Sequence, residues 1–188
     1  MRQANALLCH LVIMLGKSLW AVVPFLLPLQ CAALLLEPLV TFSEGNASAV
    51  EITKADVIIS DDDPIGVRIA AEALVKDLEQ ITGQKRRLLT WEELASNSTS
   101  SNAIIVGTID SDLIKSLSDD ELIDVSDLDG KWESFTTSTV DAPLPQVNKA
   151  LVIAGSDKRA AIFGIYTLAE QSGQSPYVFY SIYKFHPN

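Results

Sequence analysis

Cysteine and histidine are scarce in this chain of 188 residues, which contains two of each. Both cysteines, Cys9 and Cys31, and one histidine, His10, lie in a front segment, residues 1–33, that we expect to be removed as a signal peptide. The mature chain would then contain no thiol and one histidine, His186. Disulfides, cysteine-based metal sites and cysteine nucleophiles are therefore excluded from the expected chemistry.

Basic residues are few as well, because 14 Lys and Arg stand against 24 Asp and Glu and leave a formal net charge of −10. They cluster only in the stretch QKRR, residues 84–87, which we interpret as a solvated turn. Binding of a nucleic acid requires clustered positive charge to meet the phosphates. We therefore expect no nucleic-acid partner.

Sequence motifs of common catalytic sites are absent too. There is no Gly-x-Ser-x-Gly elbow, and a Ser-His-Asp triad would depend on His186 near the end of the chain, so serine hydrolysis is not expected. The turn GSDKR, residues 155–159, precedes a predicted helix, as anion-binding loops do. It lacks the three spaced glycines of a dinucleotide fingerprint and the Gly-Lys-Ser/Thr of a phosphate loop. We expect no nucleotide and no cofactor.

Carboxylates are abundant, but their spacing identifies no site. The run Asp61–Asp63 lacks the alternating ligands and the central glycine of a calcium loop, so no metal site is expected. Glycoside hydrolysis needs two carboxylates on opposite sides of a sugar, one of them with a raised pKa. Many Asp and Glu side chains could supply such a pair, and the sequence distinguishes none of them. No residue is therefore nominated as catalytic.

Charged side chains are nearly absent from the front of the chain. From Met14 the stretch MLGKSLWAVVPFLLPLQCAA combines a short basic segment, an apolar run and small residues, which is typical of a secretory signal peptide. We expect Met14 to be a possible true start, cleavage after Ala33, and a secreted protein. Sequons at Asn46 and Asn97 fit this route and predict N-glycosylation. The alternative is a membrane anchor over residues 19–36, a stretch that two prolines and a glutamine interrupt.

Hydrophobic periodicity predicts alternating strands and helices in the mature chain. Strands are expected at residues 49–52, 55–60, 87–91, 103–109, 132–140 and 150–155. Helices are expected from Pro64 to a terminating Gly83, from Asp110 or Ser111 to Leu117, at 119–123 and after 157. A polar loop is expected at 93–102 and a turn at 142–149. Asp63 is the expected N-cap of the first helix, and the last should bury Ile162, Ile165, Tyr166 and Ala169. This order predicts a single α/β (α+β) domain in which helices cover one face of a mixed sheet.

Residues 152–177, VIAGSDKRAAIFGIYTLAEQSGQSPY, closely resemble the end of the N-terminal domain of glycoside hydrolase family 115, the secreted xylan α-1,2-glucuronidases. In that family a Gly-Ser-Asp-Lys-Arg turn opens a helix that is followed by a Ser-Pro-aromatic step. Residues 59–84, ISDDDPIGVRIAAEALVKDLEQITGQ, look like the first helix of the same domain, and AIIVGTI followed by WESF adds support. The resemblance runs from about Leu39 to Tyr177.

The resemblance implies a domain similar to the second domain of β-hexosaminidases, which in this family precedes a catalytic (β/α)8-type barrel carrying the catalytic carboxylates. We thus expect a signal peptide at 1–33, this domain at 34–177 and a divergent tail at 178–188, because the family pattern is lost from Val178 onward. Ala160 also stands where the family usually has Gly. The chain is expected to be a truncated part of a secreted α-glucuronidase without the catalytic barrel. The alternative is a stand-alone secreted module that binds carbohydrate or a protein.

Lys158 and Arg159 are the candidate binding residues. One interpretation is a contact to the carboxylate of an acidic sugar in glucuronoxylan, or to the missing barrel. The other is a solvated first helical turn, or ion pairing with Asp157 and neighbouring acids. Cations at a helix N-terminus oppose the helix dipole, which favours a reason beyond helix stability. Both interpretations stay open from the sequence.

Overall fold

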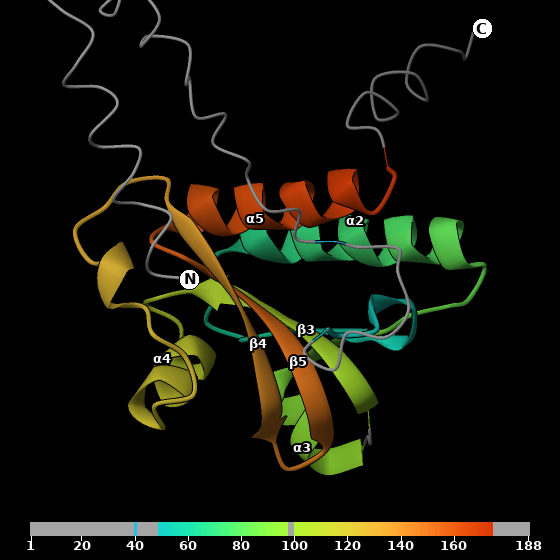
Figure 1. Ribbon diagram of the computed structural model, residues 1–188, viewed down its shortest axis with the longest axis horizontal. Helices are drawn as coiled ribbons and strands as arrows, with labels where there is room; N and C mark the ends of the chain where they lie inside the picture. The colour runs from blue at the N-terminus through green and yellow to red at the C-terminus, as the bar shows by residue number, and fades with distance from the viewer. Residues whose placement is uncertain (1–39, 41–48, 98–99, 175–188) are drawn as a thin grey trace, which may run out of the picture. The chain divides into compact units, whose positions relative to one another are not determined.

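A five-stranded mixed sheet occupies the centre of the computed structural model, which describes residues 40, 49–97 and 100–174 (Figure 1). The strands are β1 (Asp56–Ile59), β2 (Leu88–Thr90), β3 (Ser100–Thr108), β4 (Phe135–Leu144) and β5 (Val147–Gly155). Their order across the sheet is β2-β1-β3-β5-β4. The first four in this order are parallel, whereas β4 pairs antiparallel with β5.

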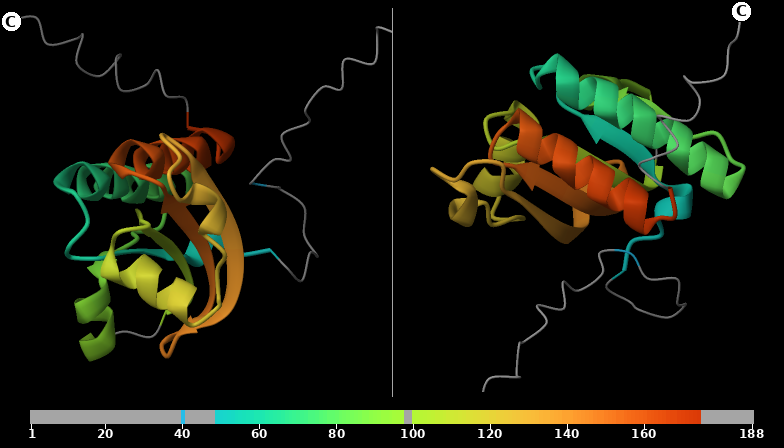
Figure 2. Two further views of the ribbon diagram at one scale, coloured as in Figure 1. Left: turned by 90° about the vertical axis from the view of Figure 1, so that its left-hand side faces the viewer. Right: turned by 90° about the horizontal axis from the view of Figure 1, so that it is seen from above.

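Helices cover both faces of this sheet (Figures 1 and 2). On one face lie the long helices α2 (Ile65–Thr82) and α5 (Lys158–Gln171), side by side, and on the other the shorter α3 (Trp91–Asn97) and α4 (Asp112–Asp119). Alternate side chains of a strand enter the two cores. Val57 and Ile59 of β1 pack beneath α2 and α5, while Ile58 between them packs with residues of α3 and α4.

The prediction of a single α/β domain with a mixed sheet is confirmed, and its two long helices share one face. The prediction placed helices on one face only, whereas α3 and α4 cover the second face. Residues 93–97, expected to be a polar loop, belong to α3 because Thr90 and Glu93 form a capping box. The Thr90 backbone N–H donates to Glu93 Oε2 at 3.0 Å, and the Glu93 N–H donates to Thr90 Oγ1 at 3.3 Å. Leu94 is then buried against the sheet.

Two predicted elements are wrong and one is shortened. Residues 49–52 form no strand and lead instead into a 3₁₀ turn, Ile52–Lys54. Residues 119–123 form no helix, because α4 ends at Asp119 and Glu121 takes a left-handed φ of 56°. The turn predicted at 142–149 is reduced to two residues, 145 and 146, between β4 and β5.

The buried stripe of α5 also differs from the prediction. Ile165 and Ala169 are buried, but Ile162 is half-buried and Tyr166 is 46% exposed. The remaining buried positions are mostly small residues: Ala160, Ala161, Gly164 and Leu168. Small side chains allow α5 to lie close to the sheet, and this leaves the aromatic side chains on its outer surface.

Several predictions concern residues outside the described ranges: the signal peptide or anchor, the sequon at Asn46, and the tail beyond Gln174. They stay predictions, as do the domain boundaries. Within the described ranges, no helix has both the length and the apolar character that crossing a bilayer requires. The described strands form an open sheet with β2 and β4 at its edges, not a closed barrel.

Candidate functional site

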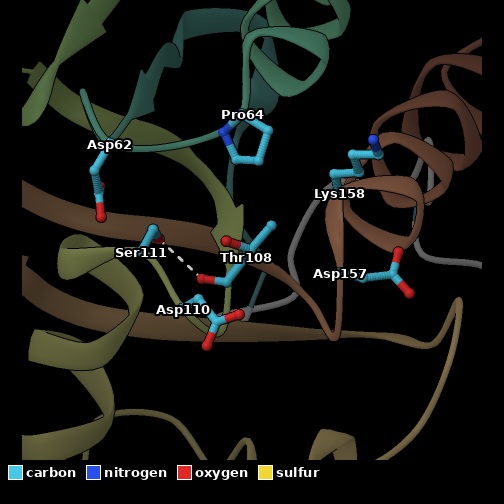
Figure 3. A pocket seen from close by; sticks show the side chains of 7 residues that line it. All are labelled: Asp62, Pro64, Thr108, Asp110, Ser111, Asp157 and Lys158. Carbon is cyan, nitrogen blue, oxygen red and sulfur yellow. Dashed lines mark hydrogen bonds between the residues drawn. The ribbon is translucent and has the colours of Figure 1, made fainter.

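The carboxyl ends of the three central parallel strands form a crevice (Figure 3). From β1 the chain crosses by α2 to β2 on one side, whereas from β3 it continues by α4 toward β4 and β5 on the other. The strand order therefore reverses between β1 and β3, and such a reversal opens a crevice beyond the carboxyl ends of the strands. The crevice has a volume of about 370 Å³ and is lined by Asp62, Pro64, Thr108, Asp110, Ser111, Asp157 and Lys158.

Two glycines allow the helices to begin close to the strand ends. A Cβ atom placed at Gly155 would overlap the backbone nitrogen of Ala161 and lie 2.8 Å from its Cα. A Cβ at Gly107 would lie 2.7 Å from Ser111 Oγ and 3.0 Å from Asp63 Oδ2. At each glycine at least one of these distances is under 3.0 Å, which is shorter than real Cβ contacts, so both positions favour glycine for a steric reason.

Asp63 links two of the loops and does not cap α2 as predicted. Its Oδ1 accepts hydrogen bonds from the backbone N–H of Thr108 at 3.0 Å and from Thr108 Oγ1 at 3.2 Å, and its Oδ2 accepts from the N–H of Ser60 at 3.4 Å. The first turn of α2 is closed instead by the Pro64 carbonyl, which accepts from the N–H of Val67 at 2.8 Å. Burial raises the pKa of Asp63 above its ordinary 3.8, and the hydrogen bonds from Thr108 and Ser60 oppose this.

Asp157 caps α5 and ties it to the segment before β4. Its Oδ1 accepts from the N–H groups of Arg159 at 2.8 Å and Ala160 at 2.9 Å, and its Oδ2 accepts from the N–H of Glu133 at 2.8 Å. These bonds favour the ionised form, so the pKa of Asp157 lies below its ordinary 3.8, with the Glu133 bond as the largest cause. Asp62 has a similar role, because it accepts from the N–H of Asp112 at 3.1 Å in the first turn of α4.

Lys158 and Arg159, the predicted binding residues, are separated by the fold. Lys158 lines the crevice, and its ammonium group makes no hydrogen bond or ion pair within the described part of the chain. Arg159 points elsewhere: its Nη1 lies 2.8 Å from Glu133 Oε1 and its guanidinium lies 5.9 Å from the ring centroid of Phe163. The ion-pairing interpretation thus describes Arg159, with Glu133 as its partner, whereas Lys158 remains available to a ligand.

The remaining predicted site residues are the glycosylation sites Asn97 and Asn46. Asn97 is the last residue of α3, and Asn46 is outside the described ranges. Sequence reasoning did not single out Asp62, Thr108 or Asp110 as crevice residues. A signal was available, because each residue ends or follows a predicted strand, and the carboxyl ends of parallel strands meet at one edge of a sheet.

The polar groups of the crevice suit recognition better than covalent chemistry. The two hydroxyl groups are engaged, since Ser111 Oγ donates to the Thr108 carbonyl at 2.8 Å and Thr108 Oγ1 donates to Asp63. Within the described residues, no three His, Cys, Asp or Glu side chains converge as metal ligands would. Among the charged residues that line the crevice, Asp110 and Lys158 have side chains with no hydrogen bond or ion pair to the described residues.

Fold and site together define an α/β domain with a ligand-sized crevice at its topological switch point. Comparison by sequence identifies no relative: no family model and no curated protein match the chain. Among solved structures, the chain is similar to a family GH115 4-O-methyl-α-glucuronidase, BtGH115A, described as having specificity for decorated arabinogalactans. The two share 25% identity with a TM-score of 0.50, over 71% of this chain and 16% of that enzyme.

A second similar structure is that of CpGH84D, with 15% identity and a TM-score of 0.43 over 72% of this chain and 22% of that one. This chain thus corresponds to a small part of each solved protein. The likeness to the GH115 enzyme connects the chain with the glycoside hydrolases, as its sequence motifs indicate.

Proposed function

We propose that the chain is a non-catalytic accessory domain of a secreted glycoside hydrolase related to the GH115 α-glucuronidases. The observation that carries this proposal is the coverage: the likeness spans 71% of this chain but 16% of the enzyme, so the counterpart of this chain is a minor part of that protein. In the whole enzyme, a separate catalytic barrel would remove glucuronic acid or its 4-O-methyl ether from polysaccharide side chains. Secretion is inferred from the signal-like stretch that starts at Met14.

The state of two carboxylates in the loops around the crevice, Asp157 and Asp63, supports a non-catalytic role. A glycosidase needs one carboxyl group as a proton donor and a second as nucleophile or base. Asp157 has its pKa lowered and is therefore held ionised, and its oxygens accept three backbone hydrogen bonds. Asp63 has a raised pKa, but both of its oxygens accept hydrogen bonds within the chain. Each of these two groups acts as a strut between loops, and neither is free to reach a glycosidic oxygen.

The outer surface of α2 and α5 offers a place for the catalytic domain. The two helices are parallel neighbours: a Cβ at Gly66 would lie 3.4 Å from Ile162, and Gln174 donates to Gln80 at 3.1 Å near their other ends. Four large apolar side chains on this surface are exposed: Ile65 (71%), Ile69 (60%), Phe163 (42%) and Tyr166 (46%). Grouped apolar exposure of this kind marks a protein interaction site.

The chain leaves the domain at the end of α5, close to this surface, so we propose that the catalytic domain covers it. In the GH115 enzyme most of the chain is not matched by this one. A domain that follows Gln174 would emerge from the same helical layer as the apolar side chains, so it could cover them with a short connection.

The direct test is an assay of the full chain, secreted by a eukaryotic host, for release of 4-O-methylglucuronic acid from glucuronoxylan oligosaccharides. We expect no release above the level of a host-only control. Release of 4-O-methylglucuronic acid in proportion to added protein would overturn the proposal. Loss of this release in Asp62→Asn or Asp110→Asn would show that the activity belongs to the crevice and not to a contaminating enzyme.

A second candidate function, a stand-alone binding module, is favoured by one observation: the crevice presents Asp110 and Lys158 without partners from the described residues. A binding module would bind a glycan tightly without a second domain. Full-length transcripts distinguish it from the accessory domain, because a stand-alone module would be encoded by messages that stop after Asn188.

A further inference from the structure

We propose that the crevice, together with the side chain of Trp132, is a binding site for a neutral saccharide. The inference deepens the proposed function by giving the accessory domain a ligand of its own, and it rests on that function only for the choice of carbohydrate probes. It stands on the crevice, on the exposure of Trp132, and on the balance of charges around the site.

Trp132 is the first observation, because it is 79% exposed. Tryptophan is large and mostly apolar, and it is enriched at binding interfaces. A flat aromatic ring can stack on the apolar C–H face of a pyranose ring, while polar groups beside it bind the hydroxyl groups.

The segment before β4 brings Trp132 to the edge of the sheet where the crevice lies. Phe135, the first residue of β4, pairs with Gly155, and Gly155 pairs in turn with Thr108, which lines the crevice. Because β4 is antiparallel to its neighbour, its beginning lies beside the carboxyl ends of the parallel strands. Trp132 precedes Phe135 by three residues and therefore lies beyond this same edge.

Hydrogen bonds hold the segment next to Asp157. The backbone N–H of Glu133 donates to Asp157 Oδ2 at 2.8 Å, and Glu133 takes a left-handed φ of 53°. Ser134 and Ser156 exchange two further bonds: the Ser134 N–H donates to Ser156 Oγ at 3.1 Å, and the Ser156 N–H donates to the Ser134 carbonyl at 2.8 Å. The backbone next to Trp132 is thus held beside the loop that carries Asp157 and Lys158.

The crevice supplies the polar part of the site. Its volume of about 370 Å³ lies in the range of small-molecule sites, about 300–1,000 Å³. Lys158 can donate hydrogen bonds and the Asp110 carboxylate can accept them, and neither has a partner within the described residues. Donors and acceptors together match sugar hydroxyl groups, which both donate and accept.

The charge of the lining selects a neutral sugar over a uronic acid. Three carboxylates, those of Asp62, Asp110 and Asp157, surround the crevice with one ammonium group, that of Lys158. Three carboxylates and one ammonium group give the lining a formal charge of −2, which disfavours a uronate relative to neutral hydroxyl groups. This inference replaces the interpretation of Lys158 as a contact for an acidic sugar. A cation does not fit either, because within the described residues the carboxylates do not converge on a metal position.

The experiment measures binding of the full chain to xylotetraose and to the same oligosaccharide bearing a 4-O-methylglucuronic acid side group, by titration calorimetry. We expect xylotetraose to bind and the acidic oligosaccharide to bind more weakly. Trp132→Ala and Asp110→Ala should each weaken the binding of xylotetraose by roughly tenfold, and Trp132→Phe should restore part of the loss. Tyr166→Ala, which removes an exposed aromatic side chain further along α5, should leave it unchanged.

Three results would overturn the proposal: no binding of xylotetraose at millimolar concentration, equal affinity of the wild type and Trp132→Ala, or tighter binding of the acidic oligosaccharide that is lost in Lys158→Ala. Loss of folding is excluded by comparing the circular dichroism of each variant with that of the wild type. Failure of the proposed function is a separate outcome, because it would appear as release of uronic acid and not as a change in these affinities.

Discussion

Substitution of Gly155 by alanine tests the packing that brings the crevice loops together. Gly155 is the last residue of β5, and the first turn of α5 folds back over it. A Cβ there would overlap the backbone nitrogen of Ala161 and lie 2.9 Å from the carbonyl carbon of Ala160. Backbone atoms cannot turn away as a flexible side chain can, so the start of α5 would have to move.

The expected cost follows from what is displaced. Overpacking of a well-packed region typically costs about 1–3 kcal/mol, and the backbone contacts place Gly155→Ala in the upper part of that range. A shift of α5 would also strain the hydrogen bonds that Asp157 accepts from Arg159 and Ala160. For a domain of this size, each kcal/mol lowers the melting temperature by roughly 3–6 °C.

Gly66→Ala is the matched control, because it makes the same chemical change on the same helical layer. Its Cβ would meet only the end of the Ile162 side chain, at 3.4 Å, which is an ordinary contact. Since Gly66 lies within α2, alanine there should stabilise the helix, by up to about 1 kcal/mol. The assay is urea unfolding followed by circular dichroism. Equal stabilities of the two variants, or a stabilised Gly155→Ala, would refute the packing argument.

Three further predictions concern the carboxylates and the helical surface. Asp157→Ala should lower the free energy of unfolding by about 1–2 kcal/mol, because the α5 cap is lost. The pKa of Asp157 is lowered in the folded state, so the wild type should lose stability as the pH falls below 3.8. Urea titrations at several pH values should show a smaller loss of stability at low pH in Asp157→Ala than in the wild type. The pKa of Asp63 is raised in the folded state, so its contribution has the opposite sign and the free energy of unfolding should fall as the pH rises above 3.8. Asp63→Asn should remove this fall. An unchanged pH profile in that variant would contradict the argument that burial raises the pKa. Ile69→Lys should reduce binding of a hydrophobic dye and self-association in light scattering without lowering stability, since Ile69 is 60% exposed; a large loss of stability would show that Ile69 packs against something.

The sheet was predictable from sequence because its central strands are short, unbroken apolar runs. Strands that are buried on both faces have this unbroken apolar sequence. Ile58 and Ile105 pack in one core, and Ile59 and Val106 pack in the other. Strands that are apolar on both faces need a helical layer on each face of the sheet. The prediction of helices on one face did not take this into account. The helix α3 was missed because its polar composition resembles a loop, although its start carries the Thr-x-x-Glu spacing of a capping box.

The candidate site was predictable only in part. The sequence identified Lys158 and Arg159 together as candidate binding residues. Adjacent residues on a helix point in different directions, however, and Arg159 forms an ion pair with Glu133. That pairing joins positions 26 residues apart, and no local pattern reveals it. Asp63 was expected to cap α2, as acids before a helix usually do, yet it turns to Thr108 on the neighbouring strand. Contacts between strands decide such roles, and they become visible only once the sheet order is known.

The central claim is that this chain is an accessory domain whose enzyme has its catalytic domain elsewhere. Sequencing of full-length transcripts tests it most directly. The account predicts messages in which the reading frame continues beyond the codon of Gln174 into a long catalytic domain that would cover Ile65, Ile69, Phe163 and Tyr166. A complete set of messages that all stop after Asn188 would contradict it.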